Sequence, residues 1–141
     1  MIIKSFQLSK LDFDKYNLYL FYGKNEGFIN EVIQDYFISN FEGEIIKYDE
    51  NEVLNNNEVI IGEILNKSLF CEKKILIISR TTDKSVKIIE EIIDKNLNDI
   101  KIIYKSSALE KKSKLRNFFE KNEKTVIVPF YEDDSKSLLP I

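Results

Sequence analysis

Short apolar runs alternate with helical patterns along the whole chain. Five runs have the length of strands: Leu18–Tyr22, Glu44–Tyr48, Ile75–Ile78, Ile100–Tyr104 and Val126–Phe130. Short, continuous apolar runs are typical of strands that are covered on both faces of a sheet. Pro129, inside the last run, predicts a strand end or an edge position, because proline cannot donate a ladder hydrogen bond.

The stretches between these runs have helical spacing. In the first stretch two sets of apolar residues recur every four positions, which predicts a helix with a wide apolar stripe. These residues are Phe28, Ile29, Val32, Ile33, Tyr36 and Phe37. Residues 57–65 predict a second helix, and residues 86–93 predict a third helix with Asp83 as its N-cap. Leu115 and Phe119 mark a fourth helix, whose outer face is rich in lysine.

Strands that alternate with helices predict right-handed βαβ crossovers and a parallel sheet with helices on both faces. We therefore expect an α/β fold with three αβα layers around a five-stranded, mostly parallel sheet. The 141 residues have the length of one domain, and no proline- or glycine-rich linker divides them. The alternation of strands and helices stops at residues 132–141, EDDSKSLLPI, where a polar turn is followed by a few apolar residues. This end indicates that the sequence has been cut near a domain boundary.

Composition narrows the classes of function. The net charge is −3, which lacks the positive excess typical of duplex-binding domains. The chain contains no histidine, so Ser-His and Cys-His pairs and the commonest zinc ligand are absent. A single cysteine, Cys71, cannot form an internal disulfide. We expect a cytoplasmic protein, because a lone cysteine fits a reducing compartment. No apolar run has the length of a membrane span, and the first residues lack the pattern of a signal peptide.

The stretch LYLFYGKNEGFINEV, residues 18–32, runs from a strand through a glycine turn into a helix. A phosphate-binding loop has the same order of strand, turn and helix, but its sequence motif is G-x-x-x-x-G-K-[ST]. Phe28 and Ile29 follow Gly27 where lysine and serine or threonine are needed, and Glu26 adds negative charge. We expect that Gly23 and Gly27 form a tight strand-to-helix turn that binds no phosphate.

Other enzyme sites are also incomplete. An ATPase of this type needs an acidic residue after a later strand, but Ser79 and Arg80 follow the third strand. The glycines do not match the dinucleotide pattern G-x-G-x-x-G, so we interpret Asp49 as a turn residue or a cap. A receiver domain would have an aspartate in place of Ser79. We interpret the carboxylate pair Glu90–Glu91 as part of a solvated helix surface. We interpret the pair Asp133–Asp134 as part of a polar turn.

Leu69 and Phe70 are two large apolar residues in the short, otherwise polar connection that follows the second helix, within NKSLFCEKKILII, residues 66–78. Connections run over the surface of a domain. The two side chains therefore either fold back onto the end of the helix or form an exposed anchor for a protein partner.

The whole chain resembles the N-terminal domain of the delta subunit of the bacterial DNA polymerase III clamp loader. Residues 18–32 and 66–78 carry the resemblance together with SSALEKKSKLRNFFEKNEKTVIVPFYEDD, residues 106–134. The last stretch is the most specific. The family has a polar turn, a K-K-x-S-K-L-R-type helix with a following aromatic residue, and a strand that ends in proline, an aromatic and a polar residue.

The resemblance implies the first of three domains, with an AAA+/P-loop-like core and a degenerate nucleotide site. Such a domain is non-catalytic, although it belongs to a DNA-directed DNA polymerase holoenzyme, a nucleotidyltransferase that acts in DNA replication. It implies no cofactor, no metal and no membrane partner. The resemblance also implies that the subunit contacts the other clamp-loader subunits through two C-terminal domains that this sequence does not contain. It implies contact with DNA only through the assembled loader.

The resemblance also assigns the partner, which is the sliding clamp, or beta subunit. Leu69 and Phe70 match the family's clamp-contacting pair, and Lys67, Ser68 and Cys71 would lie at the rim of the contact. The delta subunit holds one ring interface open so that the clamp can be placed on primed DNA. Two alternatives are another AAA+-like clamp-loader subunit and a P-loop NTPase with an unusual phosphate loop.

Overall fold

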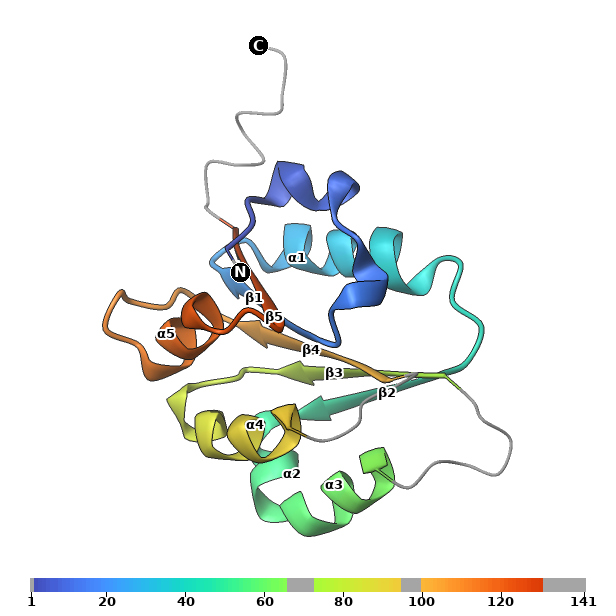
Figure 1. Ribbon diagram of the computed structural model, residues 1–141, viewed down its shortest axis with the longest axis vertical. Coiled ribbons are helices and arrows are strands. Elements are labelled where there is room, and N and C mark those ends of the chain that lie inside the picture. The colour runs from blue at the N-terminus through green and yellow to red at the C-terminus, as the bar shows by residue number, and fades with distance from the viewer. Residues whose placement is uncertain (1, 66–72, 95–99, 131–141) are drawn as a thin grey trace.

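A computed structural model describes residues 2–65, 73–94 and 100–130. Its centre is one sheet of five parallel strands in the order β2-β3-β4-β1-β5 (Figure 1). The strands are β1 (Leu18–Gly23), β2 (Glu44–Asp49), β3 (Lys74–Ser79), β4 (Ile100–Ser106) and β5 (Thr125–Phe130). All five strands predicted from the apolar runs are confirmed, and the sheet is entirely parallel.

Helices connect these strands. They are α1 (Glu26–Ile33) with the π-helix η3 (Gln34–Ile38), α2 (Glu50–Asn55), α3 (Asn57–Leu65), η4 (Asp83–Ser85) with α4 (Val86–Ile93), and α5 (Lys114–Lys121). Two 3₁₀ helices, η1 (Ser5–Lys10) and η2 (Phe13–Lys15), precede β1. The four predicted helices are confirmed, but α2 was not predicted. It begins with a capping box between Asp49 and Glu52, a sequence signal for a helix start.

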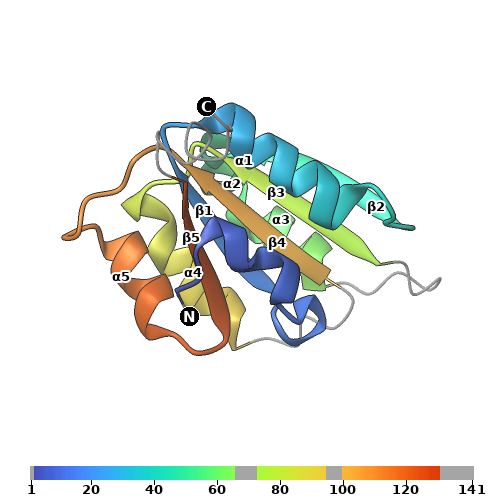
Figure 2. The same ribbon diagram turned by 90° about the horizontal axis from the view of Figure 1, so that it is seen from above.

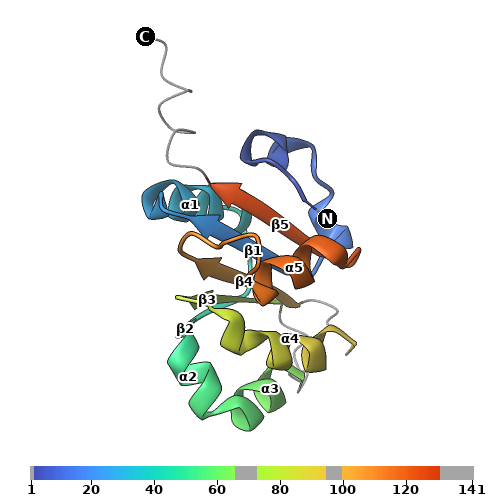
Figure 3. The ribbon, with the colours of Figure 1, turned by 90° about the vertical axis from the view of Figure 1, so that its left-hand side faces the viewer.

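The sheet is covered on both faces, which confirms the three-layer arrangement. Helix α1, η3 and the N-terminal 3₁₀ helices lie on one face, and α2, α3, α4 and α5 lie on the other (Figures 2 and 3). Strand β1 serves both layers, because Leu18 and Leu20 belong to one core and Tyr19 and Phe21 to the other. The crossover from β1 to β2 runs across the sheet in one direction, over one face. The later crossovers run in the other direction, over the opposite face. Because direction and face change together, all crossovers have the same hand.

The apolar stripe of α1 is confirmed except at Tyr36. Val32 and Phe37 are buried and Phe28 is half-buried, whereas Tyr36 is 41% exposed. The cause is η3, in which the backbone widens from i+4 to i+5 hydrogen bonds, as between Ser39 N and Gln34 O at 2.9 Å. This change rotates Tyr36 away from the stripe.

The prediction that Asp83 caps the third helix is wrong. Thr82 is the N-cap of η4, and its hydroxyl accepts from Lys84 N. The Asp83 carboxylate instead accepts from the Ser113 hydroxyl at 2.6 Å and from Leu115 N at 3.1 Å. Asp83 therefore stabilises the start of α5, a helix about thirty residues away in sequence.

Strand β5 lies at an edge of the sheet, as Pro129 predicted. Ile3 N donates to Ile127 O at 2.9 Å from the open side of this strand. Pro129 is two residues further on and faces the same side, because successive residues of a strand alternate. Its missing N–H therefore removes no hydrogen bond to β1.

The hydroxyls of Tyr104 and Tyr19 provide a matched test of buried hydrogen bonding. Tyr104 Oη is buried without a partner among the described residues, whereas Tyr19 Oη donates to the carbonyls of Phe13 at 3.0 Å and Tyr16 at 2.8 Å. Tyr104→Phe should raise the free energy of unfolding by about 1 kcal/mol, and Tyr19→Phe should lower it by about 1 kcal/mol. Urea denaturation of both variants measures this difference; equal losses would mean that Tyr104 has a partner.

The hydrogen bonds of Asp83 predict a pH dependence. The Ser113 hydroxyl and the Leu115 amide lower the pKa of Asp83, so the folded state binds its proton more weakly than the unfolded state does. The stabilisation is present above the ordinary pKa of 3.8 and is lost as the pH falls through the folded-state pKa. Asp83→Ala should therefore destabilise the domain by about 1 kcal/mol at pH 7.

Thermal denaturation between pH 7 and pH 2.5 measures this effect. The Tm difference between the wild type and Asp83→Ala should shrink at the acid end of the range. Glu91→Ala is the control, because this exposed carboxylate of α4 has no hydrogen bond or ion pair in the described part of the chain. A Tm difference that stays constant with pH would contradict the role assigned to Asp83.

Candidate functional site

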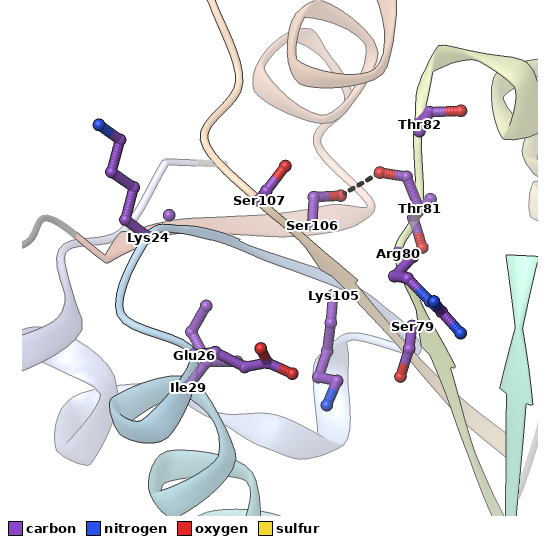
Figure 4. A pocket seen from close by; sticks show the side chains of 11 residues that line it. Lys24, Glu26, Ile29, Ser79, Arg80, Thr81, Thr82, Lys105, Ser106 and Ser107 are labelled. Carbon is purple, nitrogen blue, oxygen red and sulfur yellow. Dashed lines mark hydrogen bonds between the residues drawn. The ribbon is translucent and has the colours of Figure 1, made fainter.

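A cleft of about 430 Å³ lies at the carboxyl ends of β1, β3 and β4 (Figure 4). Ligands of open α/β sheets bind at this edge, where neighbouring strands send their connections to opposite faces. Strands β1 and β4 are such neighbours, because β1 leads to α1 on one face and β4 leads to α5 on the other. The cleft is therefore the first place to test for chemistry.

The glycine turn forms one wall of the cleft. Gly23 has φ +141°, and a Cβ at this position would lie 1.8 Å from the carbonyl oxygen of Phe130. Gly23 is thus required by the close approach of β5. A Cβ on Gly27 would meet nothing closer than Asn25 Oδ1 at 3.9 Å. The expectation that both glycines form the turn is therefore wrong for Gly27, which lies in the first turn of α1.

The residues that replace the phosphate-loop lysine and serine belong to the core. Ile29 is buried, and the Phe28 ring packs edge-on against Phe130 at 5.2 Å between centroids. The Asn25 side chain accepts from Phe28 N at 3.1 Å, so it occupies an amide at the start of α1 that a phosphate would otherwise use. The turn therefore has the course of a phosphate loop but offers no lysine and no metal-binding hydroxyl at those positions.

The loop after β3 forms the opposite wall. Ser79 ends the strand, as expected, and Arg80 adopts a left-handed backbone conformation with φ 57°. Arg80 Nε pairs with Asp49 Oδ1 at 2.5 Å, and Asp49 also caps α2, which confirms its interpretation as a cap. No carboxylate from this loop lines the cleft.

A buried carboxylate that the sequence analysis missed holds this loop in place. Glu50 accepts from Thr82 N at 2.6 Å, from the Thr82 hydroxyl at 2.8 Å and from the Ser85 hydroxyl at 2.7 Å. These bonds join the first residue of α2 to the start of η4. The only sequence signal was the capping box of α2, which marks a helix start but not a partner more than thirty residues away.

Most of the described charged side chains that line the cleft are cationic: Lys24, Arg80 and Lys105, with Glu26 as the only carboxylate among them. The Lys105 ammonium donates to Asn30 Oδ1 at 2.7 Å. Partial burial lowers the pKa of Lys105, and the Glu26 carboxylate partly opposes this shift. Lys105 was not identified from the sequence, because a lysine near a strand end is common and only the fold brings it to the glycine turn.

Leu69 and Phe70, and the rim residues Lys67, Ser68 and Cys71, lie outside the described residues. The structure places only the two ends of this connection, Leu65 at the end of α3 and Lys74 at the start of β3. Both ends lie at the amino edge of the sheet, opposite the cleft (Figure 1).

Other candidate sites add little. Glu90 and Glu91 are exposed, as expected, and Asp133–Asp134 lies outside the described residues. Within the described ranges no cluster of three or more cysteine or acidic side chains is arranged to hold a metal ion. In the same part of the chain no helix combines the length and apolarity needed to cross a membrane. No protein-family model and no curated protein sequence matches the chain.

Gly23 and Gly27 predict opposite results for the same substitution. Gly23→Ala should destabilise the domain by about 3 kcal/mol or more, because the new methyl group collides with a backbone carbonyl and the φ value is strained. Gly27→Ala should be neutral or stabilise by up to about 1 kcal/mol, because the site is open and helical. Chemical denaturation of the two variants in parallel tests the assignment, and a severe loss in Gly27→Ala would contradict it.

Proposed function

We propose that this chain is the clamp-binding domain of a clamp-loader delta subunit, with an AAA+-like core and a degenerate nucleotide site. It binds the sliding clamp and helps to open the ring for loading onto primed DNA during replication. The observation that carries the proposal is the glycine turn, in which Phe28 and Ile29 have joined the core at the positions of the phosphate-loop lysine and serine. This arrangement fits a domain that keeps the ATPase shape and leaves hydrolysis to sister subunits.

The strand order supports the same class of fold. In the two common doubly wound orders, 3-2-1-4-5-6 and 2-1-3-4-5, the first strand lies beside the second. Here β1 lies between β4 and β5, and β2 is at the far edge. The strand order therefore disfavours the dinucleotide-binding and receiver folds. This agrees with the sequence, which lacks the motifs of both classes.

The clamp contact is assigned to Leu69 and Phe70. Large apolar side chains at the centre of an interface contribute most of its binding energy when they enter a pocket of the partner. The two residues lie in the sequence between Leu65, the last residue of α3, and Lys74, the first residue of β3.

The alternative is a P-loop NTPase with an unusual phosphate loop, or an ATPase-type subunit of the same loader. The observation in its favour is the cationic cleft at the carboxyl ends of the strands. It needs a magnesium-binding carboxylate near the phosphates, and among the described residues Glu26 is the only acid that lines the cleft. Hydrolysis of Mg-ATP by this chain that is lost in Glu26→Gln would favour the alternative.

Leu69→Ala combined with Phe70→Ala should weaken clamp binding about a hundredfold, because each truncated anchor costs about 2 kcal/mol and neighbouring effects need not add. The Tm should change little, because the proposal places both side chains outside the core. Surface plasmon resonance against the sliding clamp and thermal denaturation of the same samples measure both quantities.

Tyr36→Ala is the control, because it removes a large exposed side chain from η3 on the other face of the sheet. Its clamp affinity should equal that of the wild type. A double variant that unfolds but still binds normally in its folded fraction would assign Leu69 and Phe70 to the core and refute the proposed contact.

A further inference from the structure

The cleft at the carboxyl edge of the sheet has the features of a binding site that clamp binding does not use. Its cations come from three different parts of the chain: Lys24 follows β1, Arg80 follows β3 and pairs with Asp49, and Lys105 lies near the end of β4. We propose that this cleft binds a small oxyanion, a phosphate or carboxylate group, with the Lys105 ammonium as its principal counterion. The proposal does not depend on clamp binding, because the connection that holds Leu69 and Phe70 starts and ends at the other edge of the sheet.

Lys105 carries the argument because its ammonium group forms no ion pair with a described residue, although the Glu26 carboxylate attracts it from a longer distance. Its side chain is partly buried, and its hydrogen-bond partner is the neutral amide oxygen of Asn30 at 2.7 Å. No carboxylate of the described residues lies within ion-pair distance of its ammonium group. Partial burial of an ammonium without an anionic partner is unfavourable, and a bound oxyanion would remove this penalty.

The Ser79 hydroxyl is free to complete the site beside Lys105. Among the hydroxyls that line the cleft, those of Thr81, Thr82 and Ser106 hold the loop after β3 in place, through bonds to Ile78 O, Glu50 and Thr81 O. The hydroxyls of Ser79 and Ser107 have no partner among the described residues. In Figure 4 the Ser79, Lys105 and Glu26 side chains end in one part of the cleft, whereas Lys24 extends away from it.

The same lining limits the ligand to a small group of low charge. The Glu26 carboxylate opposes the approach of a highly charged polyphosphate. Among the described residues that line the cleft, Ile29 is the only aliphatic one and none is aromatic, so these residues offer a nucleobase nothing to stack on. Asn25 caps α1, so the helix start adds little to phosphate binding. These features favour a single phosphate or carboxylate over a nucleotide.

A ¹⁵N NMR titration with inorganic phosphate, and separately with acetate, tests the proposal at constant ionic strength set by sodium chloride. Saturable shifts are expected at the amides of Ser79 and Lys105. Lys105→Met should weaken binding about tenfold or more, because it removes a charge-assisted hydrogen bond. Glu26→Gln should strengthen binding, because it removes the opposing carboxylate. Lys87→Met, at an exposed position of α4, is the matched control and should leave the affinity unchanged.

The two arms also identify the ligand class, because stronger binding of phosphate or of acetate selects one oxyanion. Lys105→Arg keeps the charge and should retain most of the affinity, which separates loss of charge from loss of fold. Linear shifts equal to those of added chloride, or equal affinities of Lys105→Met and Lys87→Met, would overturn the proposal. Binding of ATP far tighter than that of pyrophosphate would also overturn it, because the cleft would then recognise a nucleotide.

Discussion

The approach of the Phe130 carbonyl to Gly23 is the contact on which the carboxyl edge of the sheet depends. A Cβ at Gly23 would overlap this oxygen, so the end of β5 fixes the course of the turn after β1. The Phe130 ring then packs against Phe21 at 5.5 Å and against Phe28 at 5.2 Å, which joins the strand before the turn to the helix after it. Only Lys24 and Asn25 separate β1 from α1. The turn is thus too short and too tightly packed for a full G-x-x-x-x-G-K loop.

Polar side chains hold the other loops of this edge through long-range hydrogen bonds. Glu50 fixes the start of η4 from α2, and Asp83 fixes the start of α5 from η4. Ser106 joins the end of β4 to Thr81 in the loop after β3 at 2.7 Å. Each carboxylate is matched by amide or hydroxyl donors, which makes the burial of Glu50 acceptable, whereas Asp83 is exposed. The loops around the cleft are therefore held by partners other than a ligand, so the cleft is formed before any ligand binds.

The elements that could be predicted from the sequence are those in which apolar residues recur at a short, regular spacing. Buried parallel strands are continuous apolar runs and helices recur every three to four residues, so all five strands and four helices could be found from spacing alone. Helix α2 was missed because it is short and strongly polar, and its capping box was not recognised. Tyr36 was misplaced because nothing in the spacing reveals that the helix widens at η3.

The candidate site was predicted less completely, for a related reason. The absence of phosphate-loop chemistry could be read from consecutive residues, because Phe28 and Ile29 follow Gly27 directly. The partner of Asp83 and the neighbours of Lys105 could not, because they lie about thirty and seventy-five residues away in sequence. Only the strand order brings the end of β4 beside the turn after β1. A cleft assembled from three separate connections leaves no local signal in the sequence.

The sheet separates the two proposed activities in space. Strand β3 runs from Lys74, beside the connection that contains Leu69 and Phe70, to Ser79 at the cleft. A strand of this length spans about 17–20 Å. Changes at sites more than about 7–10 Å apart with no shared partners usually have additive effects. The strand between them is buried on both sides and paired along its length with β2 and β4, so it has no second arrangement by which one end could signal to the other. Oxyanion binding in the cleft and the proposed clamp binding through the connection between α3 and β3 should therefore be energetically independent in this domain.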